Sequence, residues 1–289
     1  MEDHLVRALA REAGVRVIVT ANTGLALEAA DRHGTFPIAG IALAHALTGA
    51  ALMGALLKTR QRIAMKFEGS GPLQKILVES DNNGRIRGYV SQPMIDLPDL
   101  DHDHIAAALG DTGLLTIVKD TGLPELSEST VPLGSGDIAA ELTFFLTQSE
   151  QIPSLIDISH TIDAEGTLQT TGGLLIQALP PYESDIVHQL RHNTQELPPV
   201  ADLLSSGKTP QEIVALLFGE MPYKILEERP LHFQCGCSRS RSEQALISLG
   251  AEELRQIIAT EGETIVDCHF CHEQYLFSRE DLEALIETM

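Results

Sequence analysis

All four cysteines of this 289-residue chain lie near its end, in the pairs Cys235-Gly236-Cys237 and Cys268-His269-Phe270-Cys271. Thirty residues separate the two pairs. Two thiol pairs at this separation suit a tetrahedral structural zinc site, because each pair supplies two thiolates from one turn and the intervening chain folds back. The alternative is four unrelated buried thiols, but every cysteine belongs to a pair. We therefore expect one Zn²⁺, bound by Cys235, Cys237, Cys268 and Cys271.

Three nearby histidines are weaker ligand candidates. His232, His269 and His272 could each replace a thiolate, but four cysteines already complete a tetrahedral site. A thioredoxin-like redox motif at Cys268–Cys271 alone is disfavoured, because the βαβ context of that motif is missing. A segment of fewer than sixty residues also has a small core, and a metal would stabilise it.

The first cysteine pair departs from the usual zinc-finger spacing, because one residue separates its thiols instead of two. A disulfide between Cys235 and Cys237 would close a small, strained ring, and strained disulfides are easily reduced. Arg239 and Arg241 follow closely. They could offset the charge of four thiolates and favour the thiolate form that oxidants attack. The alternative is that both arginines are solvated surface residues.

The chain's charge limits its partners. With 20 Lys and Arg against 41 Asp and Glu, the formal net charge is −21, which argues against nucleic acid or an anionic membrane as the main partner. No secretory signal is visible at the start, so we expect a cytoplasmic protein. Residues 38–57 carry no formal charge and are long enough to span a bilayer. They are rich in Ala and Gly, contain His45 and follow Pro37, which favours a buried core helix.

Residues 1–178 combine strand and helix patterns and are expected to form one core domain. Helices are predicted at about residues 24–33, 38–58 and 137–147. Strand-like runs between turn motifs predict strands at residues 15–19, 63–67, 75–79, 85–90, 114–118 and 174–179. This order indicates an α+β fold, with a mixed α/β N-terminal core domain.

Residues 179–231 change character after Pro180-Pro181. Prolines keep the predicted helices short, and no strand is expected. Thr209-Pro210-Gln211-Glu212 is a capping box that begins a helix through Leu217. Short helices are marginal alone, so this helical linker must depend on packing against its neighbours.

Residues 232–289 are predicted to form a small zinc-binding domain. Short helices are expected at residues 242–249 and 251–260, followed by a hairpin over 264–277 and a C-terminal helix capped from Ser278. The whole chain is thus divided into a core domain (1–178), a redox-sensitive linker (179–231) and a redox-switch domain (232–289).

Energetic magnitudes connect the zinc site to the linker. A structural zinc site contributes about 10–16 kcal/mol of apparent binding free energy, whereas a whole domain is stable by about 5–15 kcal/mol. Oxidation of the thiolates with loss of zinc is therefore expected to unfold residues 232–289. Linker helices that lean on this domain would then lose their order. Apolar linker side chains would become exposed: Leu203, Leu204, Val214, Leu216, Leu217 and Phe218.

Further motifs accompany the Cys-x-Cys and Cys-x-x-Cys signature along nearly the whole chain. Phe233 precedes the first pair, and Cys237-Ser238-Arg239 and Gly250-Ala251-Glu252-Glu253-Leu254 follow it. The upstream motifs are Gly69-Ser70-Gly71-Pro72, Arg87-Gly88-Tyr89-Val90, Ser149-Glu150-Gln151-Ile152-Pro153 and Gly172-Gly173-Leu174-Leu175-Ile176-Gln177. Together they closely resemble the family of heat-shock protein 33, a redox-regulated molecular chaperone.

The resemblance implies a cytoplasmic protein that is inactive when reduced and zinc-bound. Oxidants such as peroxide or hypochlorite would join Cys235 to Cys237 and Cys268 to Cys271, expelling zinc. The linker would then unfold and give an ATP-independent holdase, dimeric when oxidised and monomeric when reduced, that binds unfolded or partly folded client proteins. The apolar linker residues named above are the candidate client-binding residues.

Signals for enzymatic function are weak. Asp111-Thr112-Gly113 and Asp120-Thr121-Gly122 spell the aspartic-protease triplet, but they flank one short predicted strand that would hold their carboxylates apart. A phosphate-binding loop and a nucleophile elbow are absent from the sequence. We therefore expect no enzyme.

Two alternatives from other classes remain. A zinc ribbon could bind nucleic acid, although residues 227–289 contain thirteen acids and five Lys and Arg, which opposes it. The zinc domain could also be a structural lid on an uncharacterised enzyme in residues 1–178.

Overall fold

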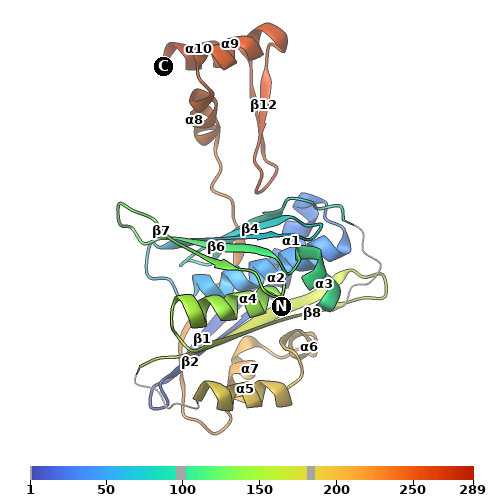
Figure 1. Ribbon diagram of the computed structural model, residues 1–289, viewed down its shortest axis with the longest axis vertical. Coiled ribbons are helices and arrows are strands. Elements are labelled where there is room, and N and C mark those ends of the chain that lie inside the picture. The colour runs from blue at the N-terminus through green and yellow to red at the C-terminus, as the bar shows by residue number, and fades with distance from the viewer. Residues whose placement is uncertain (1, 96–101, 181–185) are drawn as a thin grey trace. The chain divides into compact units, whose positions relative to one another are not determined.

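The chain folds into two units, Met1–Gln234 and Cys235–Met289. Figure 1 shows the computed structural model, which describes residues 2–95, 102–180 and 186–289. The predicted linker, residues 179–231, falls within the first unit. The division into three functional parts stays a prediction.

Two antiparallel sheets make up most of the first unit. The five strands of sheet A run in the order β10-β1-β2-β9-β8. They are β1 (His4–Ala10), β2 (Val15–Ala21), β8 (Ser154–Ile162), β9 (Leu168–Ala178) and β10 (Lys224–Pro230). Sheet B has the order β11-β5-β4-β3-β6-β7, and only the short β11 pairs in parallel. Its strands are β3 (Arg62–Gly69), β4 (Lys75–Asp81), β5 (Arg85–Val90), β6 (Gly113–Asp120), β7 (Ser127–Pro132) and β11 (His232–Phe233).

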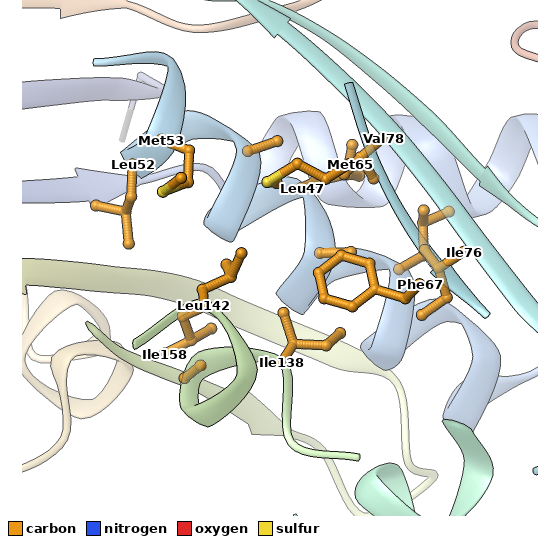
Figure 2. Packing of buried hydrophobic residues seen from close by; sticks show 14 of the residues in the cluster. Leu47, Leu52, Met53, Met65, Phe67, Ile76, Val78, Ile138, Leu142 and Ile158 are labelled. Carbon is orange, nitrogen blue, oxygen red and sulfur yellow. The ribbon is translucent and has the colours of Figure 1, made fainter. Parts of the chain in front are cut away.

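Helix α2 (Pro37–Gly54) forms the centre of the first unit and packs on both sheets. Figure 2 shows Leu47, Leu52 and Met53 between side chains of sheet B, such as Phe67, and Ile158 of sheet A. The helix is long and apolar enough to cross a membrane, but 94% of it is buried inside the structure. The expected buried core helix is confirmed. The helix carries no charge because protein side chains surround it on every side and leave no face in contact with water.

Three shorter helices complete the core: α1 (Thr23–His33), α3 (His102–Leu109) and α4 (Ile138–Phe144), which continues into the π-helical turn η1 (Phe145–Ser149). The sequence-predicted strands and helices of residues 1–178 are all present. Strands β1, β7 and β8 were not predicted. Strands β1 and β7 contain charged or small residues that hide the alternation on which strand prediction depends.

The linker helices are α5 (Ile186–Glu196), α6 (Val200–Ser205) and α7 (Pro210–Phe218). They cover the face of sheet A opposite α2, as Figure 1 shows, and form a second apolar cluster with residues such as Val19 and Leu174. The capping box of α7 is confirmed, because Thr209 Oγ1 accepts from the Glu212 N–H at 3.2 Å and Glu212 Oε2 accepts from the Thr209 N–H at 2.7 Å.

One expectation for the linker was wrong. Residues 224–230 form β10, which pairs with β1 at the edge of sheet A, although no strand was expected there. Charged residues and a terminal proline conceal a strand in sequence, yet both are common at sheet edges. The linker helices depend on packing, as expected: their buried side chains pack on sheet A, where strands β2 and β9 present an apolar face. Support from the zinc domain stays a prediction.

The second unit contains α8 (Arg239–Leu249), α9 (Ala251–Thr260), the hairpin of β12 (Thr264–Asp267) and β13 (Gln274–Phe277), and α10 (Arg279–Glu287). These elements and the cap at Ser278 are as predicted. The core of this unit is small. It consists of Leu246, Leu254, Ile258, Phe277 and Leu282. So few buried side chains make an additional stabilising group necessary in a unit of this size.

Candidate metal centre

A turn and an extended segment of the second unit carry the four cysteines. Cys268 and Cys271 lie where β12 turns into β13. There the Cys271 and His272 N–H groups both donate to the Cys268 carbonyl, at 3.2 and 2.8 Å. His272 has a φ of +56°, the left-handed conformation that completes this tight turn. The other pair, Cys235 and Cys237, precedes α8, whose N-cap is Ser238.

The sulfur atoms of all four cysteines lie within 4.8 Å of one another. Cys235 Sγ is 3.6 Å from Cys268 Sγ, and Cys237 Sγ is 3.4 Å from Cys271 Sγ. A tetrahedral site with metal–sulfur bonds near 2.3 Å requires sulfur–sulfur distances of roughly 3.8 Å. The predicted ligand set is therefore brought together with the geometry of a four-thiolate metal site.

Burial is the largest influence on the pKa values of Cys268 and Cys271 in this cluster. It raises the pKa of Cys268 and of Cys271 above the usual 9.0. The neighbouring thiols raise the pKa of Cys271 further, whereas for Cys268 the thiol of Cys235 raises the pKa and that of Cys271 lowers it. Backbone hydrogen bonds from Phe270 and Glu273 act in the opposite direction but are smaller. Without a metal these two cysteines are neutral thiols near pH 7. Binding of a metal ion must therefore release protons, as is usual for thiolate sites.

Tyr275 contributes a contact that the sequence did not reveal. Its hydroxyl donates to Cys237 Sγ at 3.3 Å, and this hydrogen bond is the largest cause of a raised Tyr275 pKa. The alternation of β13, which turns Tyr275 and Phe277 inward, was the available signal. A sequence motif for a tyrosine in this role does not exist. Donors of this kind orient metal ligands.

The two arginines downstream of the first pair have different roles. Arg241 Nη1 donates to the Gly236 carbonyl at 2.8 Å, which places a positive charge beside the first cysteine pair. Arg239 instead pairs with Asp281 at 2.9 Å, donates to the Leu276 carbonyl and lies 4.3 Å from the centre of the Phe277 ring. Arg241 therefore fits the charge-offset hypothesis. Arg239 stabilises the packing of α10 and the hairpin.

The histidines considered as substitute ligands lie outside the sulfur cluster. His232 lies in β11, opposite Arg85 in the strand register with β5. The side chain of His272 contacts Asp267, with 3.0 Å between Nδ1 and Oδ1. Among the described residues, the group of side chains close enough together to hold a metal ion consists of the four cysteines.

The candidate client-binding residues belong to the linker cluster on sheet A. Five of them are buried: Leu203, Leu204, Val214, Leu217 and Phe218. Leu216 points outward and is 40% exposed. The linker therefore hides nearly all of this apolar surface while it is packed on sheet A.

The aspartic-protease triplets are separated as expected. Asp111 precedes β6 and Asp120 ends it, so the eight-residue strand lies between the two carboxylates. Asp120 forms an ion pair with Arg62 at 2.7 Å. A proton-sharing carboxylate dyad is therefore ruled out for these two residues.

Comparisons with known proteins agree with this geometry. The family model described as "Hsp33 protein" matches residues 3–278. The 33 kDa chaperonin of Geobacter sulfurreducens is 45% identical over 288 residues, covering 99% of this chain and 96% of the relative. The 33 kDa chaperonin of a Geobacillus strain is 39% identical, and the match covers 99% of this chain and 97% of that relative.

A solved structure has the same fold over its whole length. The crystal structure of the 33 kDa chaperonin (heat shock protein 33 homolog) from Thermotoga maritima superposes with a TM-score of 0.90. It is 30% identical, and the match covers 100% of this chain and 99% of that one. The clustered cysteines, the fold and the full-length similarity to these relatives together show that the chain belongs to the Hsp33 family of chaperones.

Proposed function

We propose that this protein is a redox-regulated, ATP-independent holdase, inactive while reduced and zinc-bound and active once its four cysteines are oxidised. The observation that carries this proposal is the placement of four sulfur atoms within 4.8 Å of one another in a unit with a very small core. The unit's fold then depends on the state of its cysteines.

Zn²⁺ is the metal that best suits this donor set. Four thiolates at tetrahedral separations, with no carboxylate among them, are typical of structural zinc sites. When bound, Zn²⁺ holds the thiolates together and contributes the folding free energy that five buried side chains cannot supply.

The cysteines are the redox-active groups. Two molecules of peroxide, reduced to four of water, would take four electrons from four thiolates, with four protons consumed and two disulfides formed. The bonds would join Cys235 to Cys237 and Cys268 to Cys271. Disulfide sulfurs no longer ligate zinc, so the second unit loses its main stabilising contact and unfolds.

The linker would transmit this change through the chain. Strands β10 and β11 lead directly from the linker into Cys235, so an unfolded second unit no longer anchors their ends. Release of β10 and the linker helices would expose Leu203, Leu204, Val214, Leu217 and Phe218, and with them the apolar face of sheet A, including Val19 and Leu174. Such a surface would bind unfolded client proteins through the hydrophobic effect.

The remaining assignments follow the family. We place the protein in the cytoplasm, as a monomer when reduced and a homodimer when oxidised. Its net charge of −21 would keep it soluble while apolar surface is exposed to clients. Neither nucleic acid nor a membrane is proposed as a partner.

A single assay tests the proposal. A chemically denatured client is diluted into buffer with the reduced or the peroxide-treated protein, and light scattering and released zinc are measured in the same tube. We expect the oxidised protein to suppress aggregation without ATP, with one zinc released per chain. A protein carrying Cys268→Ser and Cys271→Ser lacks two of the four proposed ligands, so as a control it should release no zinc and behave alike with and without peroxide. Equal suppression by the reduced and oxidised forms would refute the switch.

A further inference from the structure

A basic cavity of about 740 Å³ lies in the first unit, and none of its lining residues is a cysteine. It is lined by Arg7 of β1, Arg16 of β2 and Arg229 of β10, and by Lys58 in the segment after α2. The only carboxylate among its lining residues is Glu227 of β10. Four cations against one acid give this cavity an excess of three positive charges in a chain whose net charge is −21.

Glu227 neutralises part of this charge. Its carboxylate is shared between Arg7, at 2.8 Å, and Arg229, whose Nε donates at 2.8 Å. Both arginines are largely buried, with 27% and 11% of their side chains exposed. Within the described part of the chain Arg16 forms no ion pair with a carboxylate, and its Nε donates to the neutral side-chain amide of Gln177 at 3.0 Å.

Two guanidinium donors at this site are left unsatisfied. Arg7 Nε and Arg229 Nη1 are buried and have no hydrogen-bond partner among the described residues. A buried donor without a partner costs about 1–3 kcal/mol, and more when it is charged. Burial and the charge of Arg7 also lower the pKa of Arg16 to about 10. The site therefore lacks compensating negative charge.

We propose that this cavity binds a small oligophosphate through Arg7, Arg16, Arg229 and Lys58. Guanidinium groups bind phosphate oxygens with paired N–H donors, and three of them converge here with an ammonium group at the rim. A cavity of this volume is in the range of small-molecule sites. Inorganic oligophosphates and the phosphate chain of a nucleotide share this chemistry. The proposal does not depend on the redox function.

Binding should also stabilise the docked position of β10. Glu227 and Arg229 lie on that strand, whereas Arg7 lies on β1, which pairs with it, and Arg16 lies on β2, the next strand of the sheet. A ligand that bridges these strands favours the state in which they are paired, and thermal stability should rise with its concentration.

The test uses the reduced, zinc-loaded full chain at constant ionic strength. Binding of tripolyphosphate, of a nucleoside triphosphate and of sulfate is measured by titration calorimetry and by the shift in Tm, with zinc content measured in parallel. We expect one saturable site for both phosphate chains, with sulfate much weaker. Arg16→Gln and Lys58→Gln should each weaken tripolyphosphate binding about tenfold, the loss of one charge-assisted hydrogen bond.

Arg62→Gln is the matched control, because Arg62 is an exposed arginine on sheet B, paired with Asp120 outside the cavity. It should leave affinity unchanged. Equal losses in Arg62→Gln and Arg16→Gln would mean general charge attraction and would overturn the proposal. Absence of saturable binding, or binding of the nucleotide with tripolyphosphate inert, would overturn it as well. Lys58 is exposed, so Lys58→Gln keeps the test decisive if Arg16→Gln does not fold.

Discussion

The hydroxyl of Tyr275 is a single group whose effect on the metal centre can be isolated. Tyr275→Phe removes the hydrogen bond to Cys237 Sγ and retains the ring that packs in the second unit. Loss of a contact that orients a ligand typically weakens metal binding by about 10–100-fold, so we expect zinc affinity to fall at least tenfold. The zinc affinity of the reduced protein is measured by competition with a chromogenic chelator.

The control for this variant is Tyr223→Phe, which removes a hydroxyl from a tyrosine stacked on Phe218 in the first unit. Its zinc affinity should match that of the unchanged protein. If Tyr275→Phe and Tyr223→Phe retained zinc equally well, the hydroxyl would have no part in holding Cys237.

The disulfide pairing is a second prediction at the level of residues. In the folded cluster, sulfur–sulfur contacts of 3.6 and 3.4 Å join Cys235 to Cys268 and Cys237 to Cys271, across the two pairs. Once the first oxidised sulfurs release zinc and the second unit unfolds, closing a loop of two or three residues costs less entropy than closing one of more than thirty. We therefore expect Cys235–Cys237 and Cys268–Cys271 in the fully oxidised protein, as mapped by mass spectrometry of non-reduced peptides. Cross-pairs would show that oxidation is complete before unfolding.

Much of the candidate metal centre was predictable from residue types and spacing. Thiolates must converge on a tetrahedral metal, so two close pairs identify the four candidate ligands without a structure. Tyr275 and the Arg241 contact to Gly236 could not be predicted in the same way. Each depends on how two segments far apart in the sequence pack. A single tyrosine or arginine has no partner at a fixed sequence spacing from which its contact could be predicted.

At the level of elements, the capping box of α7 contributes to the stability of the linker. Thr209→Ala removes the Oγ1 acceptor of the Glu212 N–H and should cost about 1 kcal/mol. Amide hydrogens of α7 that exchange by local opening should then exchange about fivefold faster in hydrogen-exchange mass spectrometry. Thr260→Ala, in α9 of the second unit, is the control and should leave α7 unchanged. Unaltered exchange in Thr209→Ala would mean that sheet A alone determines the stability of this helix.

Glu212 makes the same cap sensitive to pH. The backbone N–H and then the hydroxyl of Thr209 lower the pKa of Glu212 below its usual 4.5. A depressed carboxylate pKa gives stability that is complete above the unfolded value and is lost as pH falls through the folded value. The Thr209 amide resonance should therefore titrate with a midpoint below 4.5, which moves toward 4.5 in Thr209→Ala. A midpoint at or above 4.5 in the unchanged protein would contradict the cap's role.

The elements differ in how well their patterns predict them. Helix α2 is apolar on every side and was recognised, because an uncharged run of that length must be buried. Strand β10 was missed, because its residues, Lys224 to Pro230, read as an exposed charged loop. What makes it a strand is the free edge of β1, which belongs to the opposite end of the first unit's sequence. Local patterns cannot show such a partner.

At the level of the whole molecule, the linker's packing on sheet A limits how the switch can work. Five of its candidate client-binding residues are buried by the first unit's own strands. Loss of zinc would therefore have to outweigh this packing through the chain connection at β10 and β11. If peroxide released zinc but left circular dichroism and protease sensitivity unchanged, this coupling would be absent.

The packing of the linker should therefore set the threshold for activity. Leu217→Ala creates a cavity at a fully buried site and should cost about 2–5 kcal/mol, a large part of the stability of a domain. We expect this variant to suppress client aggregation while still reduced and with its zinc retained. Leu216→Ala changes the neighbouring residue, which is 40% exposed, and should leave the reduced protein inactive, as in the unchanged protein, because no cavity forms in the packing of the linker. Both variants keep all four cysteines, so zinc content separates linker release from damage to the metal centre. A reduced Leu217→Ala protein that stayed inactive until oxidation would show that undocking the linker is not sufficient to bind clients.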